Sequence, residues 1–299
     1  MADSTSIISR VKFGTAGWSF PDWEGIVYPR GLAGERLSYV ADYLDVVEIN
    51  TTFYRPPNPR QAQGWLKQAE NKPDFVFCAK LWQKFTHERG PVEPMDARTF
   101  MDGIEPLIEA GRFGALVLQF PWSFRRTEEN ILHIERLHDA FERLPQAVEV
   151  RHASWDHPEF IDFLQKRRIA FINIDQPPIR DTLRPTTHVT APFSYVRLHG
   201  RNKQDWFREN AGRDDRYNYC YSFEELGEWI SRINSLAAES ETLFVIANNH
   251  FKGQAFANAI ELKHYFTGGA VSVPPPMFDI YPQLNKIASN PPVQFNLFS

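Results

Sequence analysis

Eight short apolar runs recur along this chain, and stretches of helical length separate most of them. A regular alternation of strands and helices is typical of βαβ units, in which crossover helices join parallel strands. Eight such units predict a single α/β domain, an irregular TIM (β/α)8 barrel. The runs are VKFGTAG from residue 11, VVEINTTFY from 46, FVFCAKLW from 75, GALVLQFP from 114, AVEVRH from 147, IAFINID from 169, YVRLHGR from 195 and TLFVIANN from 242.

The intervening segments predict helices, which include 35–44, 59–70, 127–144 and 223–239. Thr127 and Ser222 stand where helix N-caps are expected. Residues 176–193 carry four prolines and no helical period, so we expect a long loop in place of the sixth helix.

The length of 299 residues and the 42% apolar content suit one large domain. We expect an N-terminal extension over 1–10, the barrel over 11–272, and a C-terminal tail over 273–299 that wraps over the barrel or leaves it. Two cysteines imply no disulfide framework, and no run reaches the roughly 18 apolar residues of a membrane span. No signal-peptide pattern opens the chain, which predicts a soluble, cytoplasmic protein without a membrane partner. The net charge of −4 argues against a generally basic nucleic-acid-binding surface.

Charged side chains occupy alternate positions of the predicted strands. Successive residues of a barrel strand face opposite ways, and the set that faces the helices must be apolar. Val148 and Val150 are therefore assigned outward, which turns Glu149 and Arg151 inward. The same argument predicts inward positions for Glu48, Asn50, Lys80, Gln119, Asn173, Asp175, Arg197 and His199.

Most barrel interiors are filled by branched apolar side chains, and barrel enzymes build their sites at the carboxyl ends of the strands. The charges thus predict a site for a small polar or anionic ligand. The residues predicted to be catalytic are Glu48, Glu149, Asp175 and His199, and those predicted to bind ligand are Lys80, Arg151, Arg197, Asn50, Gln119, Trp18, Asn248 and Asn249. The alternative is a buried structural network in which carboxylates and cations neutralise one another.

A divalent metal is not favoured at this site, and no cofactor is predicted. Glu48, Glu149, Asp175 and His199 include acceptable metal ligands. However, three interleaved cations would repel a dication, and no HExxH pattern is present.

Aromatic residues follow several predicted strands and supply either core packing or stacking surfaces for a base or sugar ring. They are Trp18, Trp23, Tyr54, Trp82, Trp122 and Trp155. A long segment after the seventh run, residues 200–222, is interpreted as a lid, a polar platform for a ligand, or a solvated insertion.

Several segments together resemble the YecE-like family, also called domain of unknown function 72. They are GTAGWSF, WEGIVYP, VVEINTTFYRPP, FCAKLWQKFTH, LVLQFPWSF, VEVRHASW, VRLHGR and NNHFKGQAFANA, between about Phe13 and about Leu262. The resemblance implies an irregular (β/α)8 barrel and leaves the activity open. Ala247 departs from the aromatic residue expected before the paired asparagines, which predicts an altered pocket beside Asn248 and Asn249.

The C-terminal segment QFNLF, residues 294–298, is similar to the Gln-x-x-Leu-Phe peptide with which bacterial DNA-processing proteins dock on the replication sliding clamp. Gln294, Leu297 and Phe298 are the predicted partner-binding residues. The alternative is that these side chains hold the tail in a groove of the chain's own barrel.

No GxxxxGK[ST], GxGxxG or GxSxG pattern supports nucleotide hydrolysis, dinucleotide redox chemistry or a serine hydrolase. The leading prediction is an anion-binding barrel that hydrolyses a phosphodiester or a nucleic-acid-derived substrate. The alternatives are carbohydrate cleavage by paired carboxylates, and a non-enzymatic ligand-sensing or adaptor protein that docks through its tail.

Overall fold

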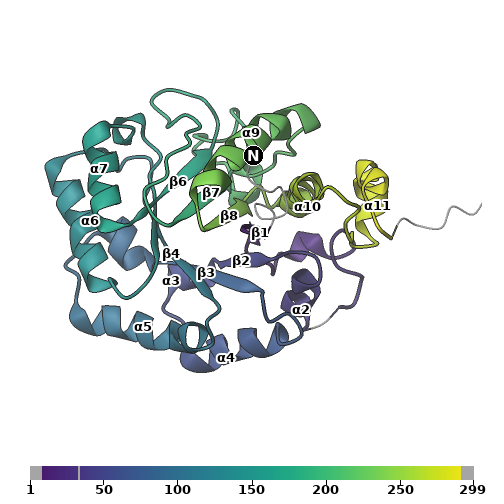
Figure 1. The fold of residues 1–299 in the computed structure, drawn as a ribbon, viewed down its shortest axis with the longest axis horizontal. Helices are drawn as coiled ribbons and strands as arrows, with labels where there is room; N and C mark the ends of the chain where they lie inside the picture. The colour runs from purple at the N-terminus through teal and green to yellow at the C-terminus, as the bar shows by residue number, and fades with distance from the viewer. Residues whose placement is uncertain (1–8, 33, 291–299) are drawn as a thin grey trace, which may run out of the picture.

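The computed structural model describes residues 9–32 and 34–290, and within them eight parallel strands close into a barrel in sequence order (Figure 1). The strands are β1 (Val11–Ala16), β2 (Val46–Ile49), β3 (Val76–Lys80), β4 (Phe113–Gln119), β5 (Gln146–Glu149), β6 (Ala170–Asp175), β7 (Phe193–Leu198) and β8 (Thr242–Ala247). The predicted TIM barrel is confirmed.

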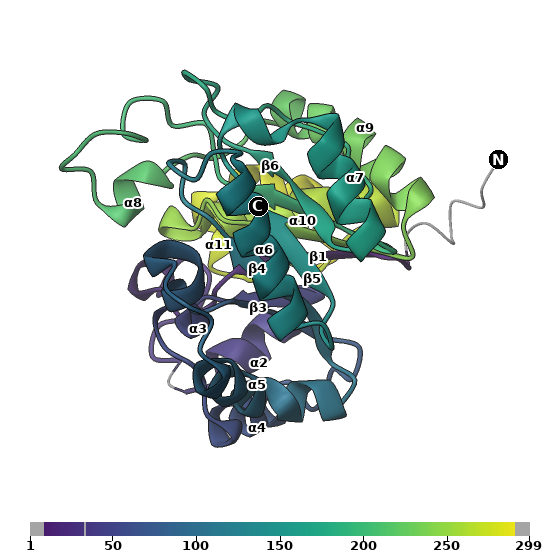
Figure 2. The ribbon, with the colours of Figure 1, turned by 90° about the vertical axis from the view of Figure 1, so that its left-hand side faces the viewer.

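Helices surround the strands (Figures 1 and 2). They are α2 (Arg36–Ala41), α3 (Thr51–Tyr54), α4 (Pro59–Gln68), α5 (Pro94–Glu109), α6 (Glu128–Ala140), α7 (Pro158–Arg167), α8 (Arg213–Arg216), α9 (Phe223–Glu239), α10 (Gln254–Thr267) and α11 (Met277–Ile280). Short turns of 3-10 or π helix are η1 (Pro21–Trp23), η2 (Lys84–Glu88), η3 (Ala153–Trp155), η4 (Phe251–Gly253) and η5 (Pro282–Lys286). Helices α3 and α8, which follow β2 and β7, lie at one end of the barrel (Figure 2).

Both predicted N-caps are present. The Thr127 side chain accepts a hydrogen bond from the backbone N–H of Asn130, and Ser222 forms a reciprocal capping box with Glu225. These bonds satisfy amide donors that the first helical turn leaves unpaired.

The second predicted strand is too long, because residues Thr51–Tyr54 form helix α3. The Thr52 hydroxyl donates to the carbonyl oxygens of Ile49, at 2.9 Å, and Lys80, at 2.7 Å. Side-chain bonds of this kind compete with strand pairing, so the chain turns immediately after Ile49.

The predicted loop between β6 and β7 is confirmed, but the predicted direction of two β6 side chains is wrong. Asn173 pairs in register with Val196, and Asp175 pairs with Leu198, whose side chains pack against α9. Neighbours in register share a face of the sheet. Asn173 and Asp175 therefore face outward.

The β6–β7 loop, which covers β6 in place of a helix, explains why the outward position Asn173 is polar. The side-chain oxygen of Asn173 accepts hydrogen bonds from the Thr186 hydroxyl and the His188 backbone N–H, each at 2.8 Å. A loop without helix leaves its own backbone groups unpaired, and these groups need such partners. The rule that outward residues are apolar holds only where a helix covers the strand.

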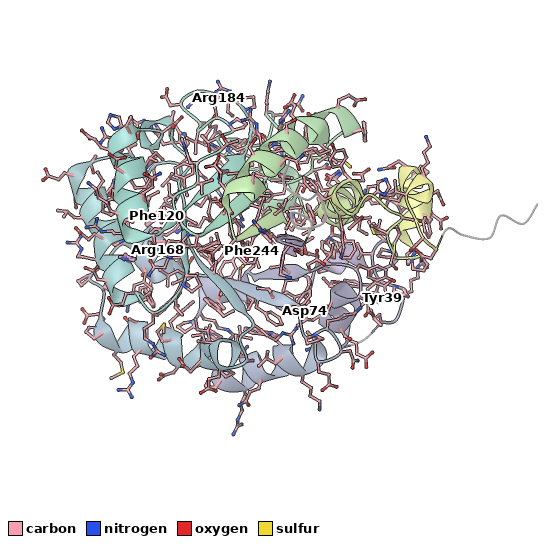
Figure 3. All side chains as sticks on the ribbon, in the orientation of Figure 1. Tyr39, Asp74, Phe120, Arg168, Arg184 and Phe244 are labelled. Carbon is pink, nitrogen blue, oxygen red and sulfur yellow. The ribbon has the colours of Figure 1, made fainter. Side chains whose placement is uncertain are left out.

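The interior is apolar at the amino ends of the strands. Phe244 of β8 lies inside the ring of strands (Figure 3), with its ring centroid 5.9 Å from that of Tyr195. Ile172 of β6 pairs with Tyr195 and belongs to the same buried cluster. By contrast, Arg184 of the β6–β7 loop lies at the periphery in this view.

The segment 273–290 packs onto the barrel beside α10 (Figure 1). Val273, Met277 and Leu284 are fully buried in one cluster with Phe256 of α10. This part of the predicted tail therefore wraps over the barrel. Gln294, Leu297 and Phe298 lie outside the described residues. No helix in the described part of the chain is both long enough and apolar enough to cross a membrane.

Candidate functional site

One guanidinium joins two strands' carboxylates across the inside of the barrel. The Nη2 atom of Arg197 (β7) donates to Glu48 of β2 at 2.7 Å, and its Nη1 atom donates to Glu149 of β5. Nη1 also donates to the side-chain oxygen of Gln119 at 2.7 Å, and Nη2 lies 3.3 Å from that of Asn248. Side chains from four strands or strand ends thus converge on Arg197.

Further groups complete the pairing of both carboxylates. The Tyr195 hydroxyl donates to Glu48 at 2.8 Å, and the Lys80 ammonium lies 3.6 Å from the same carboxylate. The Nε atom of Arg151 donates to Glu149 at 2.8 Å. The arrangement holds three cations and two carboxylates, and we call these five residues (Glu48, Lys80, Glu149, Arg151 and Arg197) the interior ion network.

Burial and neighbouring charges together set the pKa values of Glu149 and Lys80 in this network. Burial alone would raise the pKa of the Glu149 carboxyl, but the Arg197 and Arg151 guanidinium groups hold it well below its usual range. For Lys80, burial and the nearby Arg197 charge lower the pKa to about 7, against the opposing effect of Glu48. Glu149 is therefore a stable anion at neutral pH, whereas Lys80 exists in both forms.

His199 lies beside the network as a neutral imidazole. The Asn248 side-chain amide donates to Nδ1 of His199 at 2.9 Å, so Nδ1 is an acceptor. The ring proton is therefore on Nε2, which lies 3.3 Å from a Glu149 oxygen. Burial lowers its pKa to about 3. Trp206 and Tyr217 cover the ring, which is fully buried.

A cavity of about 410 Å³ lies above the network, at the carboxyl ends of the strands. The side chains of Lys80 and Arg151 are 12% and 15% exposed, whereas those of Glu48, Glu149 and Arg197 are 0% exposed. The network therefore presents its two outer cations to the cavity and keeps both carboxylates beneath. Polar lining comes from Asn50, Gln119 and Asn248, and aromatic lining comes from Trp18, Phe53, Tyr54, Trp65 and Tyr217.

The turn after β1 places Trp18 in this wall. Gly17 adopts φ +90°, a conformation that L side chains rarely adopt, and its N–H donates to the Glu48 carbonyl at 2.8 Å. The Tyr28 hydroxyl donates to the Trp18 carbonyl, and the indole meets Trp65 edge to face with ring centroids 6.2 Å apart. The indole is thus fixed by its neighbours.

Comparison with known proteins places the chain in a family. The sequence profile described as "Protein of unknown function DUF72" matches residues 12–277. The chain belongs to the DUF72 family. This bears out the YecE-like resemblance, which is the same family under another name.

Three relatives illustrate the relation. The UPF0759 protein YunF of Bacillus subtilis is 28% identical over 267 residues, which cover 84% of this chain and 93% of that protein. The crystal structure of a DUF72 family protein from Thermotoga maritima has a TM-score of 0.78 and 34% identity, covering 86% of this chain and 99% of that one. A DUF72 family structure from Enterococcus faecalis has a TM-score of 0.77 and 25% identity, covering 88% and 98%.

Four residues predicted for the site (Glu48, Glu149, Arg197 and His199) lie beneath the cavity of this DUF72 barrel, and two others belong neither to its lining nor to the interior ion network. Asp175 faces outward and pairs with Arg201 at 2.9 Å, and burial raises the pKa of its carboxyl. Asn249 donates to the Tyr219 carbonyl at 2.7 Å and to the side-chain oxygen of Asn258 in α10 at 2.9 Å. Ala247 also packs outward, against the α10 cluster, so it does not shape the cavity.

Sequence reasoning missed other parts of the DUF72 cavity. His250 lines it, with Nε2 3.5 Å from an Asp214 oxygen, and directly follows the strand-end pair Asn248 and Asn249. That position after a barrel strand was an available signal. Trp65 of α4 gave none, because it is distant in sequence from the strand ends, whereas Tyr217 belongs to segment 200–222, for which a ligand platform was one of the three interpretations.

Some of the predicted aromatic residues are core residues. Trp23 and Trp155 are fully buried, and their indole N–H groups donate to the carbonyls of His250 and Phe124. The segment 200–222 does reach the site, since Trp206 and Tyr217 cover His199 and Phe207 contacts Trp122.

The donor set of the cavity is cationic rather than metal-binding. Among residues 9–32 and 34–290, no group of three His, Cys, Asp or Glu side chains is arranged to hold a metal ion. The two interior carboxylates are each engaged by cations of the chain itself.

Proposed function

We propose that this DUF72 barrel binds a small anionic ligand with a flat portion, in the cavity at the carboxyl ends of its strands. The observation that carries the proposal is the asymmetry of the interior ion network. Its two carboxylates are buried, while Lys80 and Arg151 reach the cavity. Arg151 uses Nε for Glu149 and lines the cavity, and the remaining Nη donors of a guanidinium suit a carboxylate or phosphate.

The aromatic walls of the cavity are the reason to expect a flat portion in the ligand. Trp18, Phe53, Tyr54, Trp65 and Tyr217 line the same cavity as the two cations. Aromatic faces of this kind stack on nucleobases or on the apolar face of a sugar. A charged group over Lys80 and Arg151 and a ring between the aromatic side chains would fill both halves of the cavity.

Phosphodiester hydrolysis stays a prediction within this proposal. A general acid or base must reach the substrate, and Glu48, Glu149 and His199 lie beneath the cavity floor rather than in its lining. His250 does line the cavity, and its Nε2 atom lies 3.5 Å from an Asp214 oxygen. Glycoside cleavage is less favoured, because its general acid needs a raised pKa and that of Glu149 is lowered.

Calorimetric titration with three probes tests the proposal. Adenosine monophosphate carries both features, adenosine lacks the anion, and ribose 5-phosphate lacks the base. We expect adenosine monophosphate to bind most tightly, with affinity falling as salt rises. Arg151→Met should weaken its binding by about tenfold to a hundredfold, the equivalent of about 1.5–3 kcal/mol.

The matched control is Arg126→Met, which removes an arginine whose partner Glu159 is exposed and which does not line the cavity. Its titration should equal that of the wild type. Equal affinity for adenosine and its monophosphate, or undiminished binding by the Arg151→Met variant, would contradict the proposal.

A further inference from the structure

Within the interior ion network, the Lys80 amine has the longest ion-pair distance to a carboxylate, and it faces the cavity. Its Nζ atom lies 3.6 Å from Glu48 Oε1, beyond hydrogen-bond distance, and the same oxygen already accepts from Arg197 at 2.7 Å. Nζ also lies 5.9 Å from the centroid of the Phe53 ring, in the cavity wall. The amine thus approaches the space where a ligand would sit.

We propose that Lys80 forms a covalent imine with an anionic aldehyde or ketone that occupies the cavity. The inference rests on the proposed function, since Arg151 would hold the anionic group of the same molecule. The geometric basis is the position of the Lys80 amine at the end of β3, between the cavity and the buried Glu48 carboxylate. A second cation, Arg197, already pairs with that carboxylate.

The chemistry balances without a further co-reactant. The neutral Nζ adds to the carbonyl carbon, and one amine proton moves to the former carbonyl oxygen to give a carbinolamine. The hydroxyl oxygen then takes a second proton from solvent, and the nitrogen lone pair forms the C=N bond as the carbon–oxygen bond breaks and water leaves. The resulting protonated imine can return its N–H proton to solvent, which restores the proton balance. The product is an imine, and in its protonated form its positive charge lies beside Glu48, where the ammonium lay before.

The electrostatic surroundings favour this use of the amine. Burial and the Arg197 and Arg151 charges lower the pKa of Lys80 to about 7, against the opposing effect of Glu48 and Glu149. His87 also faces this group, with a pKa lowered to about 4 by burial and by the nearby Arg151 and Lys80. A neutral amine is therefore present near neutral pH, as nucleophilic catalysis by lysine requires.

Lys84 provides a contrast on the same segment. Its ammonium donates to Asp96 at 2.6 Å, and this bond raises its pKa. Lys84 is therefore protonated at neutral pH and lies outside the cavity lining. It is the matched control residue.

The experiment uses glyoxylate, a small anionic aldehyde, with cyanoborohydride to reduce any imine to a stable amine. Peptide mapping by mass spectrometry locates the label on the whole protein. We expect Lys80 to be labelled first, at a rate that rises with pH through a midpoint near 7, whereas Lys84 reacts only at much higher pH. Propionaldehyde, which has no anion, should label Lys80 far more slowly.

Two variants test whether the label is specific to Lys80. Lys80→Arg keeps the positive charge but cannot form an imine, so it should abolish the label at this site while the other lysines are labelled as in the wild type. Lys84→Arg should leave labelling of Lys80 unchanged. Adenosine monophosphate should slow the labelling of the wild type by competition.

The two proposals fail separately. If anions bind in the titration but glyoxylate labels Lys80 no faster than exposed lysines, Lys80 serves binding alone and the covalent inference is overturned. If Lys80 is labelled equally by glyoxylate and propionaldehyde and no anion binds, the anion-binding function fails.

Discussion

At the scale of single residues, Arg197 distinguishes interior charges that stabilise the fold from those that bind a ligand. It is fully buried and bonded to both carboxylates of the interior ion network. Removing one partner of a buried pair leaves uncompensated charge, at a cost of about 3–5 kcal/mol. We therefore expect Arg197→Met to lower the free energy of unfolding by this amount in urea titrations.

Arg151→Met is the comparison, because Arg151 reaches the cavity and water can solvate what remains. Its loss of stability should be clearly smaller, and its main effect should be on ligand binding. An Arg197→Met variant as stable as the wild type would show that Arg197 is not a structural centre of the network.

The Glu149 carboxyl predicts a pH dependence of stability. Its pKa lies well below the usual 4.5 in the folded chain. A carboxyl with a lowered folded pKa contributes stability that is complete above the unfolded pKa and is lost as pH falls through the folded pKa. The stability difference between the wild type and Glu149→Gln should therefore be constant near neutrality and narrow below about pH 4.5.

Urea titrations across this range measure that difference. Glu159→Gln is the control, because its side chain is 75% exposed, and its difference from the wild type should stay small at every pH. A wild-type advantage over Glu149→Gln that persists undiminished in acid would contradict the assigned shift.

The same residues show how far sequence reasoning reaches. Alternation along β2, β5 and β7 placed Glu48, Glu149 and Arg197 inside, because helices cover those strands and demand apolar outward positions. It failed for Asp175 on β6, where a loop replaces the helix. Segment 200–222 was interpreted as a lid, a ligand platform or a solvated insertion, and the local pattern does not choose among these. The place of Trp65 of α4 in the aromatic wall depends on tertiary packing, which no local pattern encodes.

At the scale of elements, the prediction concerns the stability of the β6–β7 loop. Asn173→Ala removes the acceptor of two hydrogen bonds, from the Thr186 hydroxyl and the His188 amide. An unsatisfied buried donor costs about 1–3 kcal/mol, so we expect a loss of that size in the free energy of unfolding and faster hydrogen exchange at the His188 amide.

Gln165→Ala is its control, because the Gln165 amide makes a single exposed bond of 3.3 Å to the Val189 carbonyl in the same loop. That variant should remain within about 0.5 kcal/mol of the wild type. Equal losses in both variants would mean that Asn173 does not organise the loop.

At the scale of the whole molecule, the strand count and spacing were enough to predict the barrel, because each βαβ unit is a local pattern and eight of them close on themselves. The C-terminal boundary was less predictable. Residues 273–290 contain few periodic apolar positions, yet Val273, Met277 and Leu284 are buried against α10. Whether such a segment packs depends on a groove that distant residues form.

The last prediction concerns docking of residues 294–298 on a partner. Asn290, the last residue described, exchanges two hydrogen bonds of 3.0 Å with Val273, so the nine residues 291–299 follow a fixed point of the barrel. In the predicted mode Gln294 supplies hydrogen bonds, and Leu297 and Phe298 fill an apolar pocket of the sliding clamp.

A synthetic peptide of residues 291–299 should bind the clamp at micromolar strength, about −8 kcal/mol. Leu297→Ala combined with Phe298→Ala should abolish binding and leave the melting temperature unchanged, because in this mode the two side chains contact the partner rather than the barrel. A peptide that does not bind, together with a lower melting temperature of the double variant, would place these side chains in the chain's own packing instead.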